Sequence, residues 1–236
     1  MSDATTPSRT DLPPIETTRK SGSERFVDGP SRTLKLSDFW AWSASDVVNN
    51  TERGALAEFI VGSAIDADTI RDGVRHGWAA YDLQAGEISV EVKSAAYIQS
   101  WRQSGYSAIS FGYRKTRKYD TDTNELDEEP SRVATVYVFA LLKHQDQATL
   151  NPLDMSQWEF YVVPTVVLDA RKRSDSSITL KSLQRFCKPV SYRELKPRVQ
   201  RAHVFLPNPD VLDRLDKTTS DWSDWPQGCE PPQGSW

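Results

Sequence analysis

The chain lacks most of the features that identify whole classes of protein. It has two cysteines in 236 residues, Cys187 and Cys229, and their wide separation predicts neither a disulfide framework nor a structural zinc site. No apolar run approaches the roughly 18 residues of a membrane span, and the N-terminus has no apolar signal segment. The three histidines are scattered, and no phosphate-binding glycine loop, nucleophile elbow or zinc-protease helix motif occurs. We therefore expect a cytoplasmic protein.

Hydrophobic residues are also scarce, at 38% of the chain, which is low for a fully globular protein. Residues 1–33 are rich in Ser, Thr and Pro with mixed charge, so they are expected to be a disordered N-terminal segment. Residues 207–236 form an acidic tail with several prolines and tryptophans. This tail is a candidate docking segment for a partner protein, or it packs back on its own domain. A single domain is expected over residues 34–206.

Apolar spacing inside this domain predicts a series of helices and strands. Capping residues at 43–46 precede a helical pattern that reaches residue 65. An aromatic and apolar stretch at 78–83 and a period-two pattern at 88–94, with a turn at Gly86 between them, predict a hairpin of two strands. The later elements are a strand at 107–113, a charged loop at 114–130, buried strands at 133–142 and 158–163, and helices at 165–172 and 180–185. This order predicts an α/β domain with a mixed β-sheet flanked by helices.

An acid and a lysine share one face of the second hairpin strand. Because alternate residues of a strand face the same side, Val90 and Val92 are expected in the core while Glu91 and Lys93 point the other way. A carboxylate can bind a hard cation, and a neighbouring ammonium can stabilise negative charge that develops on a phosphate oxygen. An ordinary salt bridge on a strand face has the same pattern. The same spacing recurs at residues 194–196, where no strand pattern surrounds it, and we interpret that copy as surface.

Two further acids distinguish the acid and lysine pair at residues 91–93 from the copy at residues 194–196. Asp82 ends the first hairpin strand, so the turn brings it towards Glu91, although Asp is also a common turn residue. Two converging carboxylates repel each other unless a cation lies between them. Glu58 stands among apolar residues of the predicted helix, where a buried carboxylate needs a metal ion, an active-site lysine or a base such as Arg53. Gln99, further along the chain, is a candidate to orient a water molecule or a base.

The order of these residues resembles that of the PD-(D/E)xK nuclease superfamily, which has the restriction-endonuclease-like fold. Glu58 lies on a predicted helix, Asp82 on a first strand, and Glu91-Val92-Lys93 on the second. The match covers about residues 44–113. The residue before Asp82 is Tyr81, whereas the motif has proline at that position.

The resemblance implies a metal-dependent endonuclease that acts on DNA, in restriction, other defence against foreign DNA, or repair. Asp82, Glu91 and the Val92 carbonyl would hold Mg²⁺, for which Mn²⁺ could substitute. Glu58 would hold a second metal ion or its bound water, and Lys93 would help to position the attacking water. A homodimer would allow two sites to cut two strands, and this expectation rests on analogy alone.

The charge distribution supports contact with nucleic acid, although the net charge of −4 does not. Residues 101–118 carry basic side chains and no acid. The charged residues of 171–201 are mostly basic, with ten Lys or Arg against two acids. The acids gather instead at 120–129 and in the C-terminal tail. The candidate phosphate-binding residues are Arg102, Arg114, Lys115, Arg117, Lys118, Arg171, Lys172 and Arg173.

Two alternatives stay open at this point. The chain could be a non-cutting nucleic-acid-binding or assembly subunit of a larger nuclease complex with the same fold. It could also belong to another enzyme class, for which His76 and Asp72, just before the hairpin, are the best acid–base pair.

Overall fold

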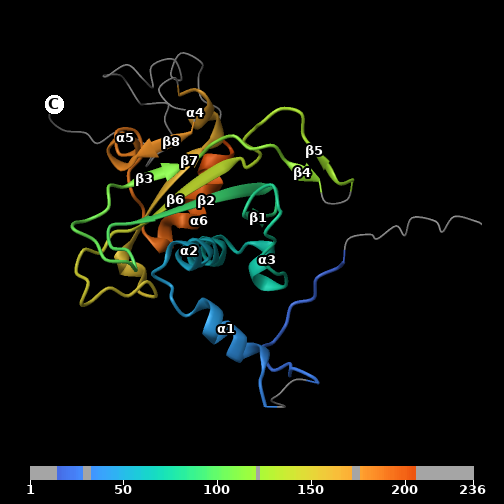
Figure 1. The fold of residues 1–236 in the computed structure, drawn as a ribbon. Helices are drawn as coiled ribbons and strands as arrows, with labels where there is room; N and C mark the ends of the chain where they lie inside the picture. Colours follow the sequence, from blue (N-terminus) through green and yellow to red (C-terminus); the bar gives the residue numbers. More distant parts are fainter. Residues whose placement is uncertain (1–14, 29–32, 121–122, 172–175, 206–236) are drawn as a thin grey trace, which may run out of the picture.

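A computed structural model describes residues 15–28, 33–120, 123–171 and 176–205 (Figure 1). The helices are α1 (Leu36–Ala44), α2 (Asn50–Ile65), α3 (Asp68–Arg71), α4 (Thr165–Asp169), α5 (Leu180–Leu183) and α6 (Leu195–His203), with 3-10 turns at Met155–Gln157 and Tyr192–Glu194. The strands are β1 (Leu83–Ala85), β2 (Ile88–Ala96), β3 (Ser110–Gly112), β4 (Tyr119–Asp120), β5 (Glu125–Leu126), β6 (Val136–Leu142), β7 (Trp158–Pro164) and β8 (Ser177–Thr179). Within these ranges, no helix is long and apolar enough to cross a membrane.

The main sheet has four strands in the order β1-β2-β6-β7. β2 runs parallel to β6, and the two outer pairs are antiparallel, so the sheet is mixed as predicted. Every residue of β6 is buried, which confirms the prediction of a central strand covered on both faces. The register places Glu91 beside Tyr137 and Lys93 beside Phe139.

Helices cover both faces of the sheet, and each face has its own apolar core. Residues of α2 and α6 pack on one face, where Val90 and Val92 join the core. On the other face, α4, α5 and the β3–β8 pair surround a core that includes Tyr137 and Phe139. Figure 1 shows α2 and the group α4, α5 and β8 on opposite sides of the sheet. The alternation predicted for β2 is therefore confirmed, with Glu91 and Lys93 on the α4 and α5 side.

The predicted start of the long helix is wrong. Residues 43–46 lie at the end of a separate helix, α1, which has Ser45 as its C-cap. The helix α2 begins later because the Asn49 side chain accepts hydrogen bonds from the backbone N–H groups of Thr51 and Glu52. It ends at Ile65, as predicted, because Asp66 takes up a left-handed backbone conformation.

The predicted position of the first hairpin strand is wrong, because β1 covers Leu83–Ala85 and shares only Leu83 with the predicted strand at 78–83. Residues 78–82 form turns and bends instead. The carboxylate of Asp82 accepts the backbone N–H of Val92, a donor that a longer β1 would otherwise have paired.

Other boundaries also differ. β3 pairs with β8 in a second, two-stranded sheet, and the predicted loop at 114–130 contains the β4–β5 hairpin. The two predicted C-terminal helices end early, at Asp169 and Leu183. The helices α1, α3 and α6 were not predicted.

Part of the predicted N-terminal tail has defined contacts with the domain. Arg19 Nη1 donates to the backbone carbonyl oxygens of Ile70 and Arg71, at 2.7 and 3.0 Å. The N–H groups of Leu36 and Ser37 donate to backbone carbonyls of Glu24 and Gly22. Residues 207–236, the predicted docking tail, lie outside the described residues, as does Cys229.

Candidate active site

The site is organised around the contact between Asp82 and strand β2. The Val92 N–H donates a 2.7 Å hydrogen bond to Asp82 Oδ2. Since the N–H and C=O of one residue in a strand point to the same edge, the Val92 carbonyl also points to the β1 side. Asp82 and this carbonyl therefore lie at the same edge of β2, just before β1 begins.

The pKa of Asp82 is raised by burial and by two neighbouring acids. Burial raises its pKa from 3.8 to about 7, and the negative charges of Glu91 and Glu58 add to the increase. The Val92 N–H and the Lys93 ammonium act in the opposite direction because they stabilise the carboxylate. These two groups do not offset the effects of burial and of the neighbouring acids, so the pKa of Asp82 stays raised.

Glu91 and Lys93 point together into a hollow, which we call the Lys93 hollow. The Lys93 ammonium pairs with the Glu91 carboxylate, and both side chains are partly buried. The hollow has a volume of about 400 Å³, and Arg114, Arg132 and Tyr137 also line it. Acid, lysine and arginines thus share one cavity, which is an arrangement suited to a phosphate group.

Glu58 lies on the other side of Asp82, in a smaller hollow of about 280 Å³ that Asp82 and Arg75 also line; we call it the Glu58 hollow. Glu58 is only 9% exposed, and both of its oxygens accept hydrogen bonds from Arg75, at 2.5 and 2.7 Å. The expectation of a buried carboxylate with a partner is confirmed, and that partner is Arg75.

The expected alternative partner, Arg53, binds only neutral groups in the contacts that the structure gives. It is buried and donates to Gln99 Oε1, Asn50 Oδ1, Ser94 Oγ and the Val48 carbonyl. The guanidinium of Arg53 is thus engaged by these groups, whereas Glu58 is paired with Arg75.

Gln99 has protein partners for its whole amide group. Its Oε1 accepts from Arg53, and its Nε2 donates to the Ala96 carbonyl and to Ser107 Oγ. Gln99 lines neither the Lys93 hollow nor the Glu58 hollow. It therefore supports the end of β2 in this structure.

The predicted phosphate-binding residues fall into separate groups. Arg114 lines the Lys93 hollow, and Lys115, Arg117 and Lys118 are exposed on the segment that leads into β4. Arg102 is exposed on the loop after β2. Arg171 lies over the Phe186 ring, 5.4 Å from its centroid, whereas Lys172 and Arg173 lie outside the described residues.

Arg132 and Tyr137 line the Lys93 hollow and were not among the predicted site residues. Arg132 has a fully buried side chain, which pairs with Asp169, donates to the Tyr113 carbonyl and lies over the Tyr113 ring. Burial, with the charge of Glu91, raises the pKa of Tyr137 above its ordinary value of 10. The position of Arg132, a basic residue just before a buried strand, was a sequence signal that could have indicated a site residue. Nothing in the sequence distinguishes Tyr137 from other aromatic residues of the core.

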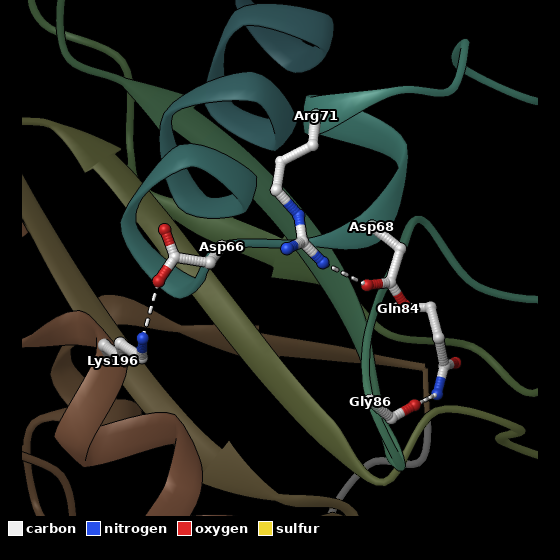
Figure 2. A network of polar contacts seen from close by, with 6 residues as sticks. All are labelled: Asp66, Asp68, Arg71, Gln84, Gly86 and Lys196. Carbon is white, nitrogen blue, oxygen red and sulfur yellow. Dashed lines mark hydrogen bonds and ion pairs between the residues drawn. The ribbon is translucent and has the colours of Figure 1, made fainter.

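The second acid-x-lysine triplet is a surface feature, as predicted. Lys196 forms a 2.5 Å ion pair with Asp66 and thereby ties α6 to the end of α2 (Figure 2). Glu194 accepts hydrogen bonds from the backbone and hydroxyl of Ser191. Between them, Leu195 belongs to the core.

The donor atoms at Asp82 fit a hard divalent cation. Two carboxylates and a backbone carbonyl supply oxygen, which Mg²⁺ and Mn²⁺ prefer. Burial is the main cause of the raised pKa of Asp82, and the charges of Glu91 and Glu58 add a repulsion that a cation would relieve. Glu58 and Glu91 each engage a base, and within the described part of the chain no group of three or more His, Cys, Asp or Glu side chains is arranged to hold a metal ion.

The structure thus places Asp82 against the backbone of Val92, at the edge of the strand whose α4 and α5 face carries Glu91 and Lys93. It keeps Glu58 close to Asp82, paired with Arg75, and gives Gln99 a separate role. The chain matches no known family model, and a search of curated proteins gives no significant match. Any inference about function therefore depends on the chemistry of this site.

Proposed function

We propose that the chain is a Mg²⁺-dependent endonuclease that acts on DNA, with the restriction-endonuclease-like fold of the PD-(D/E)xK superfamily. The observation that carries the proposal is the position of Asp82 against β2, beside the strand that presents Glu91 and Lys93. The mixed sheet with helices on both faces is compatible with this fold. A role in restriction, other defence or repair follows only from the resemblance.

Asp82, Glu91 and the Val92 carbonyl are the residues that would hold Mg²⁺. When bound there, the ion supplies a Lewis acid that polarises a phosphate and lowers the pKa of water. Glu58 is a further oxygen donor within electrostatic reach of Asp82, provided that Arg75 turns away.

Lys93 supplies the positive charge of the site. Its ammonium pairs with Glu91, which lies two residues earlier on the same strand face. When the Glu91 carboxylate is engaged by a cation, this ammonium can turn to the non-bridging phosphate oxygen and stabilise the charge that develops during in-line attack. Arg114, which lines the same hollow, can hold the phosphate in place.

The exposed basic residues before β4 provide a path for the rest of the nucleic-acid backbone. Lys115, Arg117 and Lys118 follow Arg114 directly in the chain, and all three are exposed. Contacts of this kind bind phosphate without reading sequence, so they support affinity for nucleic acid in general. The choice of DNA rests on the resemblance.

A cleavage assay tests the proposal. Full-length protein is incubated with plasmid, linear and single-stranded DNA and with RNA, each with Mg²⁺, with Mn²⁺ and with EDTA. We expect metal-dependent cutting that disappears in Lys93→Ala. Cutting that persists in EDTA, or in Lys93→Ala at the wild-type rate, would contradict the proposed site.

One observation favours a second candidate, a non-cutting nucleic-acid-binding or assembly subunit. Glu58 and Glu91 each already have a basic partner, Arg75 and Lys93, so two of the three acids are neutralised without a metal ion. Calorimetric titration with Mg²⁺ separates the two candidates. Binding that depends on Asp82 and Glu91 supports the nuclease, whereas no binding and no cleavage support the second candidate.

A further inference from the structure

A third hollow, of about 420 Å³, opens on the side of Asp82 that faces the β4–β5 hairpin; we call it the Trp78 hollow. Trp78 and Tyr119 line it, together with His76, Lys118 and Asp120. Asp82 lines it as well as the Glu58 hollow, and Ala80 and Val133 line it as well as the Lys93 hollow. It therefore lies next to the proposed active site.

Trp78 is placed where a ligand could stack on it. The residue is 77% exposed, and it lines the hollow. Its ring centroid is 6.0 Å from that of Tyr119, and the two planes are inclined by 59°, so the two rings contact each other at a tilt. The Tyr119 hydroxyl donates to Asn124 Oδ1 at 2.6 Å, which fixes this ring on the hairpin.

The charges around the hollow favour a base over a phosphate. Asp82 and Asp120 line its wall, so an anion inside it would be repelled, whereas a neutral aromatic ring would not. Lys118 lines the same hollow, and Arg117 is exposed next to it in the chain, where they can contact the backbone that carries the base. Aromatic faces beside basic residues are the usual platform for unstacked nucleobases.

We propose that the Trp78 hollow binds one unstacked nucleobase of the substrate strand, next to the phosphodiester that the site cuts. This inference rests on the proposed nuclease function and narrows its substrate. A base within a duplex is stacked and paired and cannot enter such a hollow, so the preferred substrate is single-stranded or locally opened nucleic acid.

Binding is measured apart from cleavage, by fluorescence anisotropy of full-length protein in EDTA. The probes are a fluorescein-labelled single-stranded DNA 12-mer of mixed sequence and a 12-mer of the same length whose residues are all abasic. We expect Trp78→Ala to bind the first probe about 10-fold more weakly than wild type. Trp78→Phe should restore most of the affinity, and wild type and Trp78→Ala should bind the abasic probe equally.

The matched control is Trp42→Ala on α1, a helix with no buried residue, where the Trp42 side chain is 82% exposed. It should bind both probes like wild type. Equal affinity of wild type and Trp78→Ala for the first probe, or an equal loss on the abasic probe, would overturn the base-binding site.

The outcomes for the two proposals are separable. If Trp78→Ala weakens base-dependent binding but the wild type cuts no substrate with Mg²⁺, the base site stands and the nuclease proposal fails. If the wild type cuts single-stranded DNA and Trp78→Ala binds and cuts it equally well, the nuclease stands and the base site fails.

Discussion

Oδ2 of Asp82 accepts the backbone N–H of Val92 at 2.7 Å, across the edge of β2 that β1 leaves uncovered. The Asp82 carboxylate thus accepts the N–H that a backbone carbonyl of a longer β1 would otherwise accept. The contact fixes one acid of the site relative to the strand that carries the other acid and the lysine. It also makes the local register of the hairpin part of the site's geometry.

Replacing Lys93 should remove catalysis without unfolding the domain. Lys93→Ala deletes the charge that would stabilise the reacting phosphate, so we expect the cleavage rate to fall about 100-fold or more. The side chain is about one-third exposed, and its loss should change the thermal midpoint little. Lys196→Ala is the control, because Lys196 occupies the same place in the second triplet but pairs with Asp66 on the surface. A comparable loss of cutting in this control would show that the wrong triplet was chosen.

Removal of Arg75 should both weaken the fold and improve metal binding. Arg75→Ala leaves the nearly buried Glu58 carboxylate without its partner, at a cost of about 1–2 kcal/mol after allowance for the exposure of Arg75. Chemical denaturation measures this cost, and the double variant Arg75→Ala with Glu58→Gln should recover part of it. Titration with Mg²⁺ should show tighter binding in Arg75→Ala alone. Weaker binding there would mean that Glu58 is no ligand.

The metal-free protein should lose stability as the pH rises from about 4 to about 7. The folded state holds the Asp82 proton with a pKa of about 7, against an ordinary value of 3.8, so over this interval the folded state binds more protons than the unfolded chain. Asp82→Asn should flatten this part of the profile, because the amide oxygen can still accept the Val92 N–H while carrying no charge. Thermal unfolding in EDTA at several pH values checks both statements. A wild-type midpoint that rises through this interval, with Asp82→Asn identical to it, would contradict the assigned pKa.

Mg²⁺ should counteract this loss, since a bound cation favours the ionised carboxylate. The increase in thermal midpoint on adding Mg²⁺ should therefore be larger at pH 8 than at pH 5. Asp82→Asn should show a reduced increase at both pH values.

Nucleic-acid binding should weaken steeply with salt, and Arg114 should contribute to that dependence. If Arg114 contacts one phosphate, Arg114→Ala lowers the slope of log affinity against log salt by about 1. Lys143→Ala is the control, since Lys143 pairs with Glu159 and lies outside the predicted basic segments. Fluorescence anisotropy over a series of salt concentrations gives both slopes. Identical slopes for all three proteins would remove Arg114 from the proposed phosphate contacts.

The strand β2, which carries Glu91 and Lys93, and the buried strand β6 were predictable because their patterns are local. Val90 and Val92 alternate with Glu91 and Lys93, and that alternation directly reports one buried and one open face. The uninterrupted apolar run of β6 likewise predicted a strand buried on both faces.

The elements and partners that were missed depend on the path of the chain in space. Arg75 reaches Glu58 from a segment without regular periodicity, so sequence spacing could not distinguish it from Arg53. β3 pairs with β8, more than sixty residues away, and no local pattern specifies that choice. The helix α6 was missed although Pro197 lies in its first turn, where proline is tolerated.

The parallel pairing of β2 with β6 also bears on how the site forms during folding. Asp82, Glu91 and Lys93 all come from one short hairpin, but such a hairpin alone is only marginally stable in water. Its partner β6 lies more than forty residues further along the chain, and contacts between such distant segments form late. A nascent chain therefore carries the acids and the lysine before it can hold them in place. In refolding, Mg²⁺ affinity should therefore return together with amide-exchange protection of β6.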